Sequence, residues 1–165
     1  MAEETNASTH FTWEELTHTN TGIPNPIDEA SRANMRRLCA EDLEPLRKLW
    51  GVAVAVNSGF RCLAVNTAVK GSGWKAGQLI SAHVYGRAAD LHPEGLDIGE
   101  AFEMARKSDI PYDKLMIETK KHADGTITKW IHVQCSPSPD VRPRRLAFSA
   151  AVGADGNAVY APVLK

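Results

Sequence analysis

The chain has 165 residues, with 19 basic side chains against 20 acidic ones, so its formal net charge is -1. With 43% apolar and 24% charged residues, the composition is that of a globular protein and excludes a disordered, collagen-like or coiled-coil chain. The near-neutral balance argues against a polyanion-binding main role, so we expect no nucleic-acid partner. The length predicts a single domain over residues 1–165.

Membrane insertion and disulfide bonding are not expected. No stretch approaches the ~20 apolar residues of a membrane span, and the polar first residues lack the basic and apolar regions of a secretory signal. We therefore expect synthesis in the cytoplasm. The three cysteines, Cys39, Cys62 and Cys135, are odd in number and widely spaced, which indicates neither a disulfide framework nor a C-x-x-C zinc site.

The first third of the chain is predicted to be mainly helical. Thr12 and Glu15 form the pattern of a capping box, which predicts a short helix at that point. Residues 18–26 are rich in Thr, Asn, Gly and Pro and predict a loop. Over residues 27–50 apolar side chains recur at three- and four-residue steps, which predicts a core-facing helical region that Pro45 kinks or splits.

The middle of the chain is predicted to alternate between short elements. Residues 52–56 are β-branched and apolar, which predicts a buried strand, and residues 62–69 predict a short helix. An exposed loop is predicted over residues 70–78, where Trp74 either contacts substrate or anchors the loop. A further amphipathic helix is predicted to begin after Asp97.

The C-terminal part carries the signal of a β-hairpin. Two strand-like segments, residues 115–118 and 127–135, flank a glycine-containing loop at residues 123–125. A last pair of segments, residues 146–148 and 159–163, predicts two edge strands. Helices and strands without β-α-β alternation predict an α+β domain, in which helices pack on one side of a mainly antiparallel sheet.

Two residues in the middle of the chain suit a metal site. His83 lies among small turn formers, and the strand predicted at residues 88–91 would hold Asp90 while the preceding loop folds His83 back towards it. Catalytic zinc takes three protein ligands and keeps a fourth position open for water. His92, on the same strand face as Asp90, is either a further group beside the metal or a solvated residue at the strand end.

The third predicted ligand is His132. Strand alternation puts Ile127, Ile131, Val133 and Cys135 on the predicted core face and Trp130, His132 and Gln134 on the opposite face. A loop at residues 123–125 places Glu118 opposite Trp130, so Glu118 becomes a diagonal neighbour of His132. We therefore expect one Zn²⁺ per chain, held by His83, Asp90 and His132.

Two further residues are assigned to the chemistry. Glu118 is the candidate general base, which takes the proton of a metal-bound water and returns it to the leaving amine. Arg61 would hold a substrate carboxylate through its two-pronged guanidinium, with Ser81 as a nearby donor. The alternatives are that Arg61 serves a structural ion pair and that Glu118 only supports the hairpin.

The order and spacing of these residues resemble the D-Ala-D-Ala carboxypeptidase-like zinc peptidases, over nearly all of the chain. The resemblance rests on Val56-Asn-Ser-Gly-Phe-Arg61, Asn66, Ser81-x-His83-x-x-Gly86-x-Ala88-x-Asp90 and Trp130-x-His132-Val133. The family includes bacterial peptidoglycan peptidases and phage endolysins, and it shares the Hedgehog/DD-peptidase fold. The resemblance implies zinc ligands at His83, Asp90 and His132 and a substrate-positioning role for Arg61. Some branches carry a glutamate at the position of Lys129 or a histidine at that of Trp130, whereas Glu118 resembles the glutamate of the phage-type branch.

The function that the resemblance implies is a zinc metallopeptidase, either a carboxypeptidase or an endopeptidase. It would cleave a peptide bond in peptidoglycan stem peptides or cross-bridges as a phage or prophage endolysin, acting on the cell wall after release from the host cytoplasm. We expect a monomer. The alternative is a non-catalytic peptidoglycan-binding or virion structural domain that keeps the fold.

Overall fold

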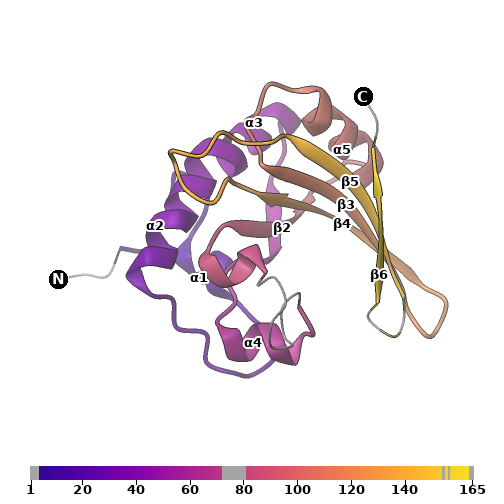
Figure 1. The fold of residues 1–165 in the computed structure, drawn as a ribbon, viewed down its shortest axis with the longest axis horizontal. Coiled ribbons are helices and arrows are strands. Elements are labelled where there is room, and N and C mark those ends of the chain that lie inside the picture. The colour runs from indigo at the N-terminus through magenta and orange to yellow at the C-terminus, as the bar shows by residue number, and fades with distance from the viewer. Residues whose placement is uncertain (1–3, 72–80, 154, 156, 164–165) are drawn as a thin grey trace.

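Figure 1 shows an open six-stranded sheet with helices packed against it, in a computed structural model that describes residues 4–71, 81–153, 155 and 157–163. The helical segments are α1 (Trp13–Thr17), α2 (Glu29–Leu38), the π-helical η1 (Cys39–Leu43), α3 (Glu44–Trp50), α4 (Leu63–Ala68), the 3-10 helix η2 (Ala82–Tyr85) and α5 (Ile98–Lys107). The strands are β1 (Val54–Ser58), β2 (Ala88–Pro93), β3 (Lys114–Lys121), β4 (Ile127–Gln134), β5 (Leu146–Val152) and β6 (Ala158–Pro162). The predicted loop over residues 70–78, with Trp74, lies outside the described residues except for its first two positions.

The strand order of the sheet is β1-β2-β4-β3-β5-β6, and all neighbours are antiparallel except β3 and β5. The predicted α+β class with a mainly antiparallel sheet is therefore confirmed. The prediction of two C-terminal edge strands is half wrong, because β6 lies at the edge whereas β5 lies between β3 and β6. The antiparallel strand β4 returns the chain to the start of β3, and residues 135–145 then carry it to the other side of β3, where β5 begins.

The N-terminal helices follow the predicted signals closely. The capping box of α1 is confirmed, since Thr12 and Glu15 exchange side-chain and backbone hydrogen bonds. The longer helical region begins at Glu29 rather than residue 27, because the Asp28 side chain caps it. The helical region runs without a break to Trp50, but its geometry changes just before Pro45, where the π-helical η1 precedes α3.

The first strand differs from its predicted bounds, since β1 covers Val54–Ser58 instead of residues 52–56. Gly51 ends α3 in the left-handed conformation, with φ 68°, and the two residues after it turn the chain towards the sheet. The last residue of β1, Ser58, lies opposite Asp90 of β2. The strand therefore ends beside a predicted metal ligand.

The predicted hairpin of β3 and β4 is confirmed together with its register. The His122 backbone N–H donates to the Thr126 carbonyl at 2.8 Å, and Glu118 lies opposite Trp130. One detail of the predicted core face is wrong, because the side chain of Ile127 is 58% exposed. It lies at the tip of the hairpin, next to the loop.

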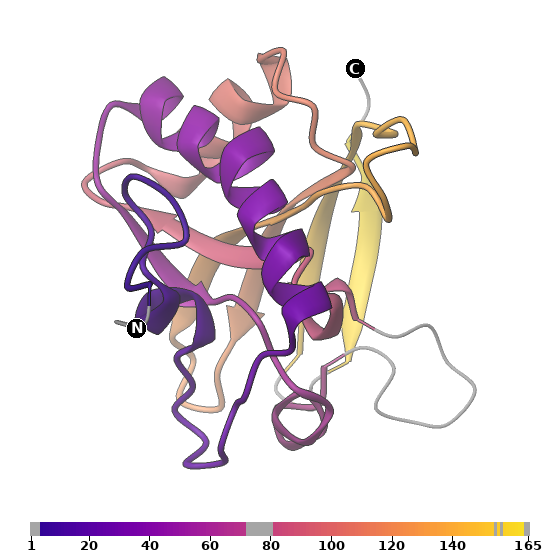
Figure 2. The ribbon, with the colours of Figure 1, turned by 90° about the vertical axis from the view of Figure 1, so that its left-hand side faces the viewer.

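The apolar core lies between one face of the sheet and the helices α2, η1, α3 and α5. In Figure 2, α2 and α3 lie in front of the strands that they cover. The fully buried residues of this core include Met35, Leu38, Leu43, Leu46, Leu115, Ile131 and Val133. The opposite face of β4 carries His132. Among the described helices, none has both the length and the apolar character required to cross a bilayer.

Candidate metal centre

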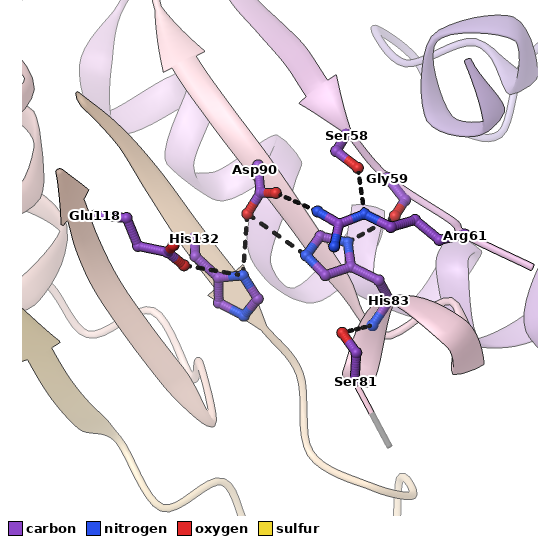
Figure 3. Close-up of polar contacts among 8 residues, drawn as sticks. All are labelled: Ser58, Gly59, Arg61, Ser81, His83, Asp90, Glu118 and His132. Carbon is purple, nitrogen blue, oxygen red and sulfur yellow. Dashed lines mark hydrogen bonds and ion pairs between the residues drawn. The ribbon is translucent and has the colours of Figure 1, made fainter. Parts of the chain in front are cut away.

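Three predicted ligands from separate elements meet on the face of the sheet away from the apolar core. His83 comes from η2, Asp90 from β2 and His132 from β4, where it lies directly opposite Asp90. Figure 3 shows both imidazoles turned towards the Asp90 carboxylate. All three side chains are buried, and one nitrogen or oxygen from each lies within 4.8 Å of the others. They form the one such cluster found among the described residues.

The Asp90 carboxylate is the centre of this cluster. Its Oδ1 lies 3.0 Å from His132 Nδ1 and 3.5 Å from His83 Nε2. Its Oδ2 accepts a hydrogen bond from Arg61 Nη2 at 2.7 Å, and Arg61 Nε donates to the Ser58 hydroxyl at 2.8 Å. Arg61 therefore fixes the carboxylate so that the other oxygen faces the two imidazoles.

Backbone geometry determines which nitrogen His83 presents. Its Nδ1 lies 2.7 Å from the Gly59 carbonyl, which accepts only a protonated nitrogen, so Nε2 keeps the lone pair that a metal needs. The Ser81 side chain caps η2 by accepting from the His83 backbone N–H at 3.4 Å. Gly86 then returns the chain to β2 with φ 67°, and a Cβ there would lie 2.3 Å from the Ser31 carbonyl oxygen. Only glycine fits this turn.

The protonation states of His83 and Asp90 suit metal ligands. Burial and the neighbouring Arg61 guanidinium lower the pKa of His83 to about 4. Burial opposes the ionisation of Asp90, but the imidazoles beside it hold the pKa of this carboxyl well below its ordinary value. Burial likewise opposes protonation of His132, yet the hydrogen bond and charge of Asp90 raise its pKa. At neutral pH the cluster thus offers an ionised carboxylate and a neutral His83.

Glu118 lies beside the cluster, as the predicted register requires. Its Oε1 is 3.8 Å from His132 Nδ1, and its side chain is 16% exposed, so it is reachable from solvent. Burial raises the pKa of Glu118 above its usual value, although the nearby His132 opposes the shift. A carboxylate with a raised pKa next to a metal-ligand cluster has the position and proton affinity of a general base.

The donor set fits zinc. Two imidazole nitrogens and one carboxylate oxygen are the ligands that catalytic zinc uses, with a fourth position left open. In zinc sites the second ring nitrogen of a ligand histidine usually donates a hydrogen bond to another group. His83 meets this condition, because its Nδ1 donates to the Gly59 carbonyl. The residues present could therefore hold one zinc ion. Their roles as ligands, and those of Arg61, Ser81 and Glu118, remain predictions from the sequence.

The cluster opens into a cleft of about 620 Å³. Its described lining includes Arg61, Ser81, Glu118, Trp130 and three residues that the sequence analysis did not single out, namely Met116, Lys120 and Tyr160. Alternation along β3 puts Met116 and Lys120 on the face of Glu118, so strand periodicity was a signal for both. Tyr160 had no such signal, because it reaches the cleft through the long-range pairing of β5 with β3.

The other candidate residues lie outside the cluster. The His92 side chain is exposed, which agrees with the solvated strand end. The three cysteines are free thiols, and burial raises the pKa of Cys39 and of Cys135 to about 12, so neither is a reactive nucleophile.

The comparisons with known proteins concern most of the chain. The family model described as Peptidase M15 matches residues 9–134. This range contains α1 to β4 and all six candidate site residues, whereas β5 and β6 follow it. No match was found among the curated proteins.

Proposed function

The chain belongs to the peptidase M15 family, and we propose that it is a zinc-dependent peptidase that cleaves a peptide bond in peptidoglycan stem peptides or cross-bridges. The observation that carries this proposal is the buried His83–Asp90–His132 cluster at the side of a cleft, with the Glu118 carboxylate 3.8 Å from His132. A purely structural role would leave this combination without an explanation.

Each residue has a defined task in the proposed reaction. Zinc, when bound, supplies Lewis-acid polarisation of the scissile carbonyl and of a water. Glu118 accepts the water proton at a carboxylate oxygen and delivers it to the leaving nitrogen. Arg61 orients Asp90 through its Nη2 and is itself held by Ser58 through its Nε, which leaves the Nη1 side of the guanidinium for a substrate carboxylate.

The biological setting belongs to the same proposal. In this proposal the protein is a peptidase with one domain that acts as a monomer on the cell wall after release from a phage-infected cell. For this role it would need only a cleft into which a wall peptide can bind. The proposed peptidoglycan substrate is supported by the family and by Arg61 at the cleft, since wall stem peptides carry free carboxylates that a guanidinium can bind.

The test is digestion of purified peptidoglycan by the zinc-loaded full chain, followed by mass spectrometry of the released fragments. We expect new peptide termini at one type of bond, and no such fragments from the same protein after chelation of zinc. A protein that binds zinc in a 1:1 ratio but releases no fragment would contradict the peptidase and favour the non-catalytic wall-binding domain.

A further inference from the structure

A second cleft, of about 510 Å³, joins the first at the metal-ligand cluster. Ser81, Met116, His132 and Tyr160 line both clefts. On β3, Met116 lies opposite His132, with Lys114 towards the second cleft and Glu118 towards the first. The two clefts therefore form one groove that passes the cluster in the direction of the strands.

The second cleft is strongly basic. Its described lining contains Arg87, Lys114 and Arg144 and no acidic side chain. The buried Asp113 carboxylate pairs with Arg144 and offsets one of these three charges. This wall therefore keeps an excess of positive charge. Such a wall attracts an anionic group and repels a cationic one.

Arg144 is held in place by a buried partner. The Asp113 side chain is fully buried, and it accepts hydrogen bonds from Arg144 Nε at 2.9 Å and from the Arg144 backbone N–H at 3.0 Å, while Arg144 Nη2 pairs with its second oxygen. The Arg144 side chain nevertheless remains 52% exposed. Its guanidinium is thus fixed on one edge and accessible from the cleft, which lowers the entropy cost of binding a ligand.

The backbone at Arg145 is strained, and the guanidinium groups of Arg144 and Arg145 point in different directions. Arg145 has φ 54°, a left-handed conformation that costs a non-glycine residue about 1 kcal/mol. Its side chain turns away to donate to the Ser108 carbonyl at 2.6 Å and lies over the Tyr112 ring. Of these two arginines, only Arg144 lines the cleft.

His132 offers a further donor. Its Nε2 is buried and has no hydrogen-bond partner among the described residues. Figure 3 shows this nitrogen pointing away from Asp90 and Glu118. If this cluster held a metal through Nδ1, the nitrogen beside Asp90, then Nε2 would keep its hydrogen for an acceptor group entering the groove.

We propose that Arg144, with Lys114 and Arg87, forms a carboxylate-binding subsite for the peptide substrate, on the side of the metal centre away from Glu118. The inference rests on the proposed peptidase function and deepens it. A substrate that fills both clefts extends on both sides of the bond that is cut, so the geometry favours an endopeptidase over a carboxypeptidase. Arg144, Phe148 and Tyr160 follow the range matched by the family, whereas Arg87 and Lys114 lie within it.

The test uses synthetic peptidoglycan stem peptides, alone and cross-linked, made with free carboxylates and with each carboxylate amidated in turn. One carboxylate of the bound peptide should lie at Arg144, and its amidation should lower the kcat/KM of the wild type by about 10–100-fold, mainly through KM. The reason is that the charged hydrogen bond between this carboxylate and Arg144 is lost. Arg144→Gln should lose this preference for the free carboxylate, and Arg144→Lys should keep part of it.

The matched control is Arg142→Gln, which removes the same charge from an exposed neighbour that is not part of the cleft lining. Because Arg144→Gln also leaves Asp113 buried without its partner, its melting temperature is measured, and Lys114→Gln provides a second variant that leaves the Asp113 pair intact. If Arg144→Gln and Lys114→Gln both discriminate between the peptides as Arg142→Gln does, the subsite is refuted.

A binding measurement separates this proposal from the peptidase function. Calorimetry of the free and amidated peptides with the metal-free protein needs no turnover, and we expect the free carboxylate to bind more tightly to wild type and equally to Arg144→Gln. Equal binding of both peptides to wild type overturns the subsite even if the enzyme cleaves them. Preferential binding without cleavage supports the subsite and overturns the peptidase.

Discussion

Consecutive residues of β4 lie in two different environments. Ile131 and Val133 face the helices and are fully buried among apolar side chains, whereas His132 between them faces the opposite side and contacts Asp90. Apolar contacts fill the first environment, while the second opens into a cleft and brings together the polar atoms of the candidate metal ligands. Stability and metal binding are thus assigned to opposite faces of the same strands, and substitutions should separate them.

The largest expected effect is on the metal face. His83→Ala removes one of three ligands and should abolish tight zinc binding, a greater loss than the roughly 10–100-fold that follows the loss of an outer partner. The metal-free protein should still fold. Zinc titration and thermal melting of the same preparation measure both, with the exposed His92→Ala as control. Equally tight zinc in His83→Ala would disprove the site.

The next effect is on turnover rather than on zinc. Glu118→Gln keeps the size of the side chain but loses its proton affinity, so kcat/KM should fall by about 10²–10⁴-fold while zinc remains bound. Glu118→Asp should be intermediate, because its carboxylate is withdrawn by about 1 Å. Glu94→Gln, at an exposed position, is the control. Turnover near that of wild type would mean that Glu118 only supports the hairpin, a contribution of at most about 1 kcal/mol.

On the apolar face a substitution should lower stability and leave zinc binding and turnover unchanged. Leu115 is fully buried on β3, one residue before Met116 of the groove. Leu115→Ala should lower the free energy of unfolding by about 2–5 kcal/mol through lost burial and a cavity. Urea denaturation measures this loss. Zinc affinity and kcat/KM of the folded fraction should stay close to wild type, and a parallel loss of zinc would break the separation of the two faces.

The smallest expected effect concerns a charged residue, Asp42, that is buried on the apolar side. Asp42 of η1 is fully buried, its carboxylate has no hydrogen-bond partner among the described residues, and burial raises its pKa from 3.8 to about 7. The folded state therefore binds this proton more tightly than the unfolded state, so its contribution to stability is complete below pH 4 and is lost as the pH rises to about 7.

Asp42→Asn removes this titration. At pH 8 the variant should be more stable than wild type by about 1–3 kcal/mol, the cost of an unsatisfied buried group, and the two should be similar at pH 4. Urea denaturation at pH 4 and at pH 8 measures the difference in unfolding free energy between the variant and the wild type. The candidate metal ligands titrate in both proteins, so their contribution cancels in this difference. A difference that does not change with pH would show that Asp42 is not the titrating group.

Local signals were sufficient for much of the fold and for the hairpin that places Glu118 near His132, whereas the grouping of His83 and Asp90 with His132 also rested on the family resemblance. The capping box at Thr12 and the alternation around His132 depend on neighbours within a few residues, and the three-residue hairpin loop fixed the register of Glu118. Strand bounds were less accurate, because the place where β1 starts depends on its partner β2 and not on its own β-branched residues.

Long-range pairing could not be predicted in the same way. Nothing near Leu146 indicates that β5 pairs in parallel with β3, and without that pairing Phe148 and Tyr160 cannot be placed beside the metal cluster. Arg144 illustrates the same limit. Its sequence context is a short basic cluster, and its buried partner Asp113 is 31 residues away.

The attachment of the β5–β6 ribbon has a consequence for how such proteins can diversify. The ribbon joins the rest of the sheet through the edge of β3, after the matched range ends at Gln134, while the zinc-ligand candidates lie on η2, β2 and β4. One wall of the groove therefore comes from elements that carry none of the zinc-ligand candidates, so an exchange of this ribbon, by recombination or by design, would leave those three residues in place. Grafting ribbons of different charge onto this scaffold offers a route to peptidases with new sequence preferences.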